Sequence, residues 1–124
     1  MIEALKGFPT KVLVLSWKGH VTKHDYETVL IPAVEEALKR QGKVRLYYLI
    51  DTDFSGFEYG AMWEDFKVGM EHLLRWERIA VVTDLEWVGF TLRAFSFVIP
   101  GVFKVFRVDE RAKARKWILE DVTG

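Results

Sequence analysis

The chain has 124 residues, half of them apolar and 15% aromatic, and its 18 basic and 18 acidic side chains give a net charge of zero. This composition predicts one folded domain over residues 1–124 and argues against intrinsic disorder. The balanced charge argues against nucleic-acid binding, and the lack of cysteine excludes disulfides, thiol catalysis and Cys-ligated metals.

The first residues and the apolar runs bear on where the protein acts. The N-terminus shows no basic region followed by an apolar stretch, which is the pattern of a signal peptide. The apolar runs are far shorter than the roughly 20 residues of a membrane-spanning helix. We therefore expect a cytoplasmic protein without a membrane span.

Two β-rich runs, Ile2 to Leu5 and Val12 to Trp17, open the chain and predict an antiparallel hairpin whose first strand lies at a sheet edge. A helix follows. Thr22 and Asp25 match a capping box, and apolar residues recur at helical spacing until Gly42. Pro32 predicts a kink or a restart of this helix near Ile31.

The rest of the chain alternates strands with helices. The strands are predicted at Val44 to Ile50, Ile79 to Val82 and Val102 to Phe106. The helices are predicted at about residues 59–74, from a cap at Thr83 or Asp84 to about Phe97, and after a cap at Asp109 with Ala114, Trp117 and Ile118 inward. The order β-β-α-β-α-β-α-β-α predicts an α/β fold. It has a mostly parallel five-stranded sheet, an antiparallel N-terminal edge strand and four main helices.

Several segments, which together cover nearly the whole chain, carry a family resemblance. They are residues 21–27, 30–34, 42–46, 57, 60–65, 76–87, 106 and 114–118, and the most specific is Trp-Glu-Arg-Ile-Ala-Val-Val-Thr-Asp at 76–84. The chain resembles the SpoIIAA-like family, which is related to the STAS domains (sulfate transporter and anti-sigma factor antagonist). The resemblance implies a β-α superhelix with helices packed over the sheet. It also implies a non-enzymatic interaction or ligand-binding module.

The loop after the third predicted strand is where the resemblance to anti-sigma factor antagonists would place a phosphorylated serine. Their Asp-Ser-Ser/Ala-Gly-type motif is missing from residues 51–60, and Glu58 and Tyr59 stand near its place. Ser55 and Thr52 are candidate phosphorylation sites, because a phosphate near a helix start would change the local charge. The alternative is that both hydroxyls only stabilise a turn.

Acidic residues form a second candidate site. Asp51, Asp53 and Glu58 follow one predicted strand and Asp84 follows the next, at the sheet edge where α/β folds usually bind ligands. Carboxylates gathered there would suit Mg²⁺. The alternative reading is that each aspartate caps a turn or a helix.

The aromatic residues are the most unusual feature of the composition. Trp63, Phe66, Trp87 and Phe90 are the candidate ligand or interface residues, and Trp63, Trp87 and Phe90 fall outside the apolar stripes of their helices. They would line a pocket for a hydrophobic or lipid-like ligand, form a surface for another protein chain, or pack in the core. The surface position predicted for three of them favours the second reading.

The motifs of common enzymes are missing. The sequence has no Gly-rich phosphate loop and no nucleophile elbow, and His20 and His24 lack a third metal ligand. We expect no enzyme activity, cofactor or metal centre. The leading hypothesis is a STAS-related interaction or regulatory module that forms a homodimer or binds another protein. The alternatives are a carrier of a small hydrophobic ligand and a Mg²⁺-dependent acidic site.

Overall fold

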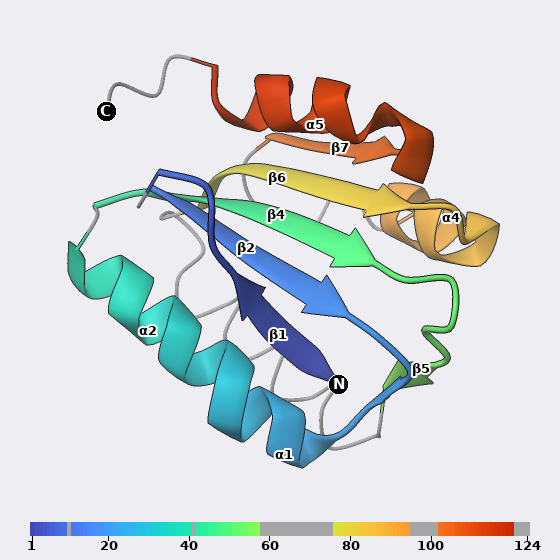
Figure 1. The fold of residues 1–124 in the computed structure, drawn as a ribbon, viewed down its shortest axis with the longest axis horizontal. Coiled ribbons are helices and arrows are strands. Elements are labelled where there is room, and N and C mark those ends of the chain that lie inside the picture. Colours follow the sequence, from blue (N-terminus) through green and yellow to red (C-terminus); the bar gives the residue numbers. More distant parts are fainter. Residues whose placement is uncertain (10, 41, 58–75, 95–101, 121–124) are drawn as a thin grey trace.

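A five-stranded sheet forms the centre of the protein (Figure 1). The structure is a computed structural model and describes residues 1–9, 11–40, 42–57, 76–94 and 102–120. In spatial order the strands are β1 (Ile2–Leu5), β2 (Val12–Trp17), β4 (Val44–Ile50), β6 (Trp76–Thr83) and β7 (Val102–Phe106). β1 pairs antiparallel with β2, and all other pairs in this sheet are parallel. The predicted sheet, including its antiparallel N-terminal edge, is confirmed.

Three main helices lie in the described part of the chain, where four were predicted for the whole. The helical elements are α1 (Lys23–Asp25), η1 (Tyr26–Leu30), α2 (Ile31–Arg40), α4 (Glu86–Ala94), η4 (Val108–Glu110) and α5 (Arg111–Ile118). α1, η1 and α2 follow one another without a break and make one long helix. The helix predicted at about residues 59–74 lies outside the described residues, and so does the predicted end of α4 near Phe97.

The long first helix starts as its sequence predicts. The Thr22 hydroxyl accepts a hydrogen bond from the Asp25 amide, and the Asp25 carboxylate accepts one from the Thr22 amide. The restart that Pro32 predicted near Ile31 is seen as a change of helix type, because the π-helical turn η1 ends at Leu30 and the α-helix α2 begins at Ile31. The wider turn accommodates the missing N–H of proline without breaking the helix.

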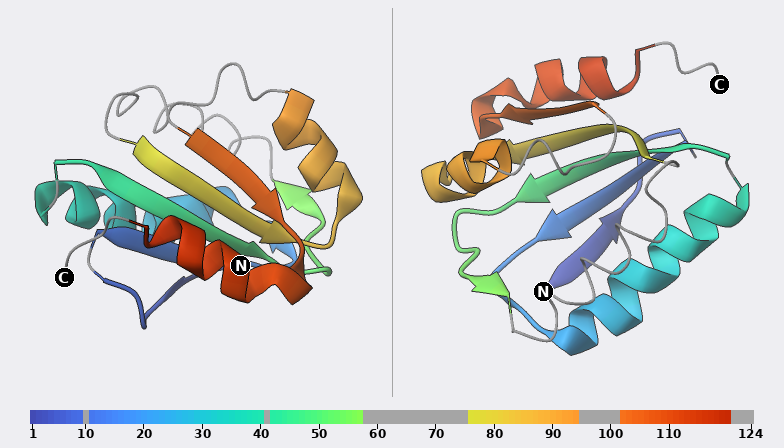
Figure 2. Two further views of the ribbon diagram at one scale, coloured as in Figure 1. Left: turned by 90° about the horizontal axis from the view of Figure 1, so that it is seen from above. Right: turned by 180° about the vertical axis from the view of Figure 1, so that it is seen from behind.

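Helices cover both faces of the sheet. In the left view of Figure 2, α5 crosses in front of the strands and α2 lies behind them. Because side chains alternate along each strand, every inner strand contributes to two cores. The first core joins the sheet to the long helix and α4, through Tyr26, Leu30, Val34 and Val88. The second lies under α5, where Ala114 and Ile118 pack on Val12, Val14, Tyr47, Ala80 and Val82.

Two arginines on the α5 face hold the end of that helix. Arg45 is 4% exposed, and its guanidinium donates hydrogen bonds to the carbonyl oxygens of Ile118 and Glu120 and to the carboxylate of Glu77. Arg78 donates to the carbonyl oxygen of Trp117 at 2.7 Å. Cations at a helix C-terminus are favourable, because the last carbonyl groups have no partner in the helix and carry partial negative charge.

A small second sheet lies at the carboxyl end of the main strands. β3 (His20–Val21) pairs in parallel with β5 (Gly56–Phe57), a pairing that the sequence did not predict because each strand has only two residues. Asp53 supports it by accepting a hydrogen bond from the Gly19 amide at 3.0 Å. Among the described residues no helix is long and apolar enough to cross a membrane.

Candidate functional site

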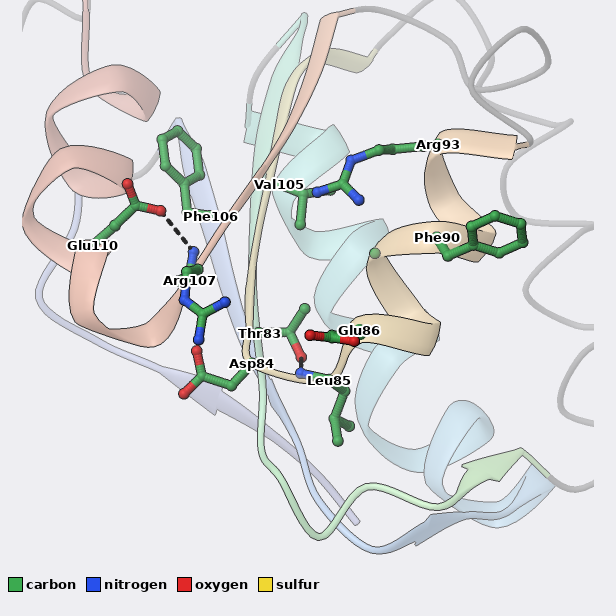
Figure 3. A pocket seen from close by; sticks show the side chains of 11 residues that line it. Thr83, Asp84, Leu85, Glu86, Phe90, Arg93, Val105, Phe106, Arg107 and Glu110 are labelled. Carbon is green, nitrogen blue, oxygen red and sulfur yellow. Dashed lines mark hydrogen bonds between the residues drawn. The ribbon is translucent and has the colours of Figure 1, made fainter.

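A pocket of about 470 Å³ opens at the carboxyl ends of β6 and β7 (Figure 3). One side is formed by α4 and the other by η4 and the residues before it. The lining residues are Thr83, Asp84, Leu85, Glu86, Gly89, Phe90, Arg93, Val105, Phe106, Arg107 and Glu110. Its size is that of a small-molecule site, and ligands of open α/β sheets bind at this edge.

The turn between β6 and α4 is fixed by the two residues that the sequence placed at a helix cap. The Thr83 hydroxyl accepts a hydrogen bond from the Leu85 amide at 3.1 Å, one residue before α4 begins. Asp84 does not cap α4, because its carboxylate accepts a hydrogen bond from the Val108 amide at 3.0 Å. Asp84 therefore ties the end of β6 to the start of η4.

The opposite wall is held by Glu110. Its carboxylate accepts a hydrogen bond from the Arg107 amide at 3.0 Å, and Lys113 lies 3.8 Å away. Asp109 was predicted to cap the last helix. It lies instead inside the 3₁₀ turn η4, and the residue directly before α5 is Glu110, whose side chain makes no capping hydrogen bond to that helix. The N-cap position of the last helix is therefore Glu110, one residue later than the predicted Asp109, because the 3₁₀ turn η4 precedes α5.

The outer side of α4 carries two large aromatic side chains. Phe90 is 74% exposed and Trp87 is 49% exposed, which confirms their predicted surface position. The Trp87 ring stacks on Phe54 with a centroid distance of 5.7 Å and an angle of 10°. Phe54 is buried, so it holds Trp87 in place, whereas the Phe90 side chain extends from the outer side of the helix (Figure 3).

Comparison with known proteins assigns the chain to a family. The family model described as SpoIIAA-like matches residues 12–119. The chain belongs to the SpoIIAA-like family. The resemblance seen in the sequence is thereby confirmed.

A solved structure supports the same assignment. It is the crystal structure of an uncharacterised protein with a SpoIIAA-like fold from Shewanella loihica PV-4, 28% identical, with a TM-score of 0.77. The match covers 94% of this chain and 93% of that one. A comparison with curated proteins gave no match.

The acidic residues of this SpoIIAA-like protein serve its turns. The Asp51 carboxylate accepts a hydrogen bond from the Asp53 amide at 3.1 Å, Asp53 bonds the Gly19 amide, and Asp84 bonds the Val108 amide. Glu58 lies outside the described residues. Within the described part of the chain no group of three or more acidic or histidine side chains is placed to hold a metal ion. The turn and capping interpretation therefore describes the three visible aspartates better than a Mg²⁺ site.

The two candidate phosphorylation sites lie in the loop between β4 and β5. Both residues are exposed; the Ser55 amide bonds the carbonyl of Gly19, and the Thr52 hydroxyl is 3.4 Å from the Asp51 carboxylate. Trp63 and Phe66, the other aromatic candidates, lie outside the described residues. Of the sequence candidates that lie in the described part of the chain, the pocket brings together Asp84 and Phe90.

Four charged residues of the pocket were not predicted: Glu86, Arg93, Arg107 and Glu110. Arg107 directly follows β7, so the rule that predicted Asp51 and Asp84 at strand ends would also have found it. Arg93 and Glu110 carry no such signal, because one is in the last turn of α4 and the other is in a 3₁₀ turn. Arg93 and Glu110 line the same pocket because β6 pairs with β7, and no local sequence pattern predicts that pairing.

Proposed function

We propose that this SpoIIAA-like protein is a non-enzymatic interaction module that self-associates through the outer surface of α4. The observation that carries the proposal is the exposure of Phe90, 74%, beside a half-exposed Trp87 on the same helix. Residues three apart on a helix lie on one face, so the two rings form one apolar area. Aromatic residues of this kind often carry most of the binding energy when a protein interface covers them.

A second copy of the chain is the partner that we propose. The net charge of zero means that two copies do not repel each other overall. In a two-fold symmetric dimer the same surface meets its own copy, so one exposed aromatic pair serves both subunits. Trp87 is already held against Phe54 at 5.7 Å, which lowers the entropy lost when its free side is covered.

Sedimentation velocity over a range of protein concentrations tests this proposal. Wild-type protein should shift from monomer to dimer as the concentration rises. Phe90→Ser should weaken dimerisation by about tenfold or more, as expected for a residue at the centre of an interface. Leu5→Ser is the matched control, because Leu5 is an exposed apolar residue, 39% accessible, on the opposite edge strand β1. A wild-type protein that remains monomeric at the highest concentration contradicts the proposal.

The pocket supports a second candidate function, transport or sensing of a small ligand. Its volume of about 470 Å³ is large enough for a metabolite-sized molecule. The sequence favoured a hydrophobic ligand, but only Leu85, Phe90, Val105 and Phe106 among the lining residues are large and apolar. Native mass spectrometry of freshly purified protein tests for a bound molecule, and a spectrum of the bare chain alone would count against this function.

A further inference from the structure

The charged side chains of the pocket indicate what kind of ligand it takes. We propose that the pocket binds a small organic molecule with two acidic groups, one held by Arg93 and the other by Arg107. This inference rests on the second candidate function, ligand binding, and is independent of self-association. In Figure 3, Arg93 extends from α4 toward Val105, whereas Arg107 extends from the end of β7 toward Asp84.

The acidic residues of the pocket are largely engaged within the protein. Asp84 accepts a hydrogen bond from the Val108 amide at 3.0 Å. Glu110 accepts one from the Arg107 amide at 3.0 Å and lies 3.8 Å from Lys113. Glu86 stands in the first turn of α4, where the positive end of the helix dipole partly offsets its charge. Asp84 and Glu110 therefore keep their negative charge but each has a donor within the protein, whereas Glu86 has the helix dipole alone.

The two arginines have no such partners. Among the described residues, neither guanidinium forms a hydrogen bond, and neither has a carboxylate within the 4.0 Å of an ion pair. Other arginines of the chain have protein partners. The guanidinium groups of Arg40 and Arg45 form ion pairs with carboxylates, and the guanidinium of Arg115 donates a hydrogen bond to the Gly7 carbonyl oxygen at 3.0 Å. The pocket lining thus holds two guanidinium groups without an acceptor in the described part of the chain, beside three carboxylates of which two accept a backbone amide hydrogen bond. A guanidinium presents paired donors that fit a carboxylate or phosphate group.

The position of Arg93 keeps its guanidinium at the pocket. A Cβ atom built on Gly89 would lie 3.5 Å from Nη1 of Arg93 and 3.6 Å from Cγ1 of Val105. The guanidinium therefore lies over the helix backbone at Gly89, on the side of α4 that is near Val105, although the residue as a whole is exposed.

Calorimetry on the full chain at low salt tests the proposal with two simple probes. Glutarate carries two carboxylates, and butyrate is a chain of similar length with one. Glutarate should bind more tightly than butyrate, and Arg93→Gln or Arg107→Gln should each weaken glutarate binding by about tenfold, the loss expected for one charge-assisted interaction. Each variant should then bind glutarate about as weakly as the wild-type protein binds butyrate.

Arg40→Gln is the matched control, because Arg40 is an exposed arginine in the last turn of α2, as Arg93 is in α4. Circular dichroism should show that all three variants are folded. Equal affinities for glutarate and butyrate, or equal affinities of the pocket variants and Arg40→Gln for glutarate, would overturn the proposal. Dimerisation is measured on the same samples to distinguish the two proposals. Glutarate binding can be absent while concentration-dependent association is present, and association can be absent while glutarate binds.

Discussion

The helices that follow the last two strands are held by the sheet in different ways. α5 buries Ala114 and Ile118 completely, and the guanidinium groups of Arg45 and Arg78 donate hydrogen bonds to the carbonyl oxygens of its last turn. It is the helix that covers the second core, so the sheet face beneath it depends on its position. Packing and electrostatics both fix α5 in place.

α4 has fewer such contacts. Val88 and Gly89 are the buried residues of its nine, and its largest side chains, Trp87 and Phe90, face outward. Arg93 in its last turn has no ion-pair partner among the described residues. The comparison teaches that the two helices have different tasks. α5 completes the fold, whereas α4 keeps apolar and cationic groups accessible, as the proposed association and ligand binding require.

The largest expected difference concerns the big apolar residues of the two helices. Ile118→Ala should lower the free energy of unfolding by about 3 kcal/mol, because Ile118 is fully buried and the substitution leaves a cavity. Phe90→Ala should change it by less than about 0.5 kcal/mol, because the ring is mostly in water already. Urea denaturation of both variants checks the comparison. Equal losses would mean that the α4 surface contributes to the fold.

The next largest difference in stability is expected between substitutions of two arginines, Arg45 beside α5 and Arg93 in α4. Arg45→Met should lower the free energy of unfolding by about 2 kcal/mol, because it removes the donor to the carbonyls of Ile118 and Glu120. We place the loss below that of a fully broken buried ion pair, since Lys11 still lies 3.3 Å from Glu77. Arg93→Met should have almost no effect on stability. Denaturation curves of the two variants measure the difference, and an Arg45→Met protein as stable as the wild type would contradict the anchoring role.

The order of strands and helices could be predicted because each element carries its own pattern. The buried run in β6 and the capping box at Thr22 and Asp25 are local signals, and both predicted the right element. β6 begins at Trp76, earlier than the predicted Ile79, because Glu77 and Arg78 are partly buried strand residues that look like a polar loop in the sequence. Strand ends are set by pairing with neighbours, which local patterns do not contain.

The candidate site could be predicted only in part, for the same reason. That Asp51 and Asp84 follow adjacent parallel strands was predicted correctly from the strand order. The partners of their carboxylates were not, because Asp84 bonds an amide 24 residues away at Val108. Arg45 is a similar case. It looks like a surface residue between Val44 and Leu46, and its burial depends on the end of α5, 73 residues along the chain.

Acid should weaken the anchor of α5 before it affects the outer surface of α4. Burial alone would raise the pKa of the Glu77 carboxyl, but hydrogen bonds and positive charge from Arg45 and Lys11 outweigh it and hold the pKa below its ordinary value of 4.5. A carboxyl whose pKa is lowered by folding contributes stability above its unfolded pKa and loses that contribution as the pH falls through the folded value. Wild-type protein should therefore lose stability below pH 4.5, by less than either substitution effect above.

Glu77→Gln separates this contribution from the rest of the acid response. The variant should be less stable than the wild type at neutral pH, because the charged partner of Arg45 is gone, and the gap should narrow as the pH falls below 4.5. Glu35→Gln, a change at an exposed residue of α2, should leave the acid response of the wild type intact. The remaining acid dependence should include Asp25, whose pKa is also lowered: burial opposes the shift, but hydrogen bonds from Thr22 and the nearby N-terminal amine outweigh it. Stability curves of Glu77→Gln and wild type that stay parallel through this pH range would show that the anchor of α5 does not depend on the charge of Glu77.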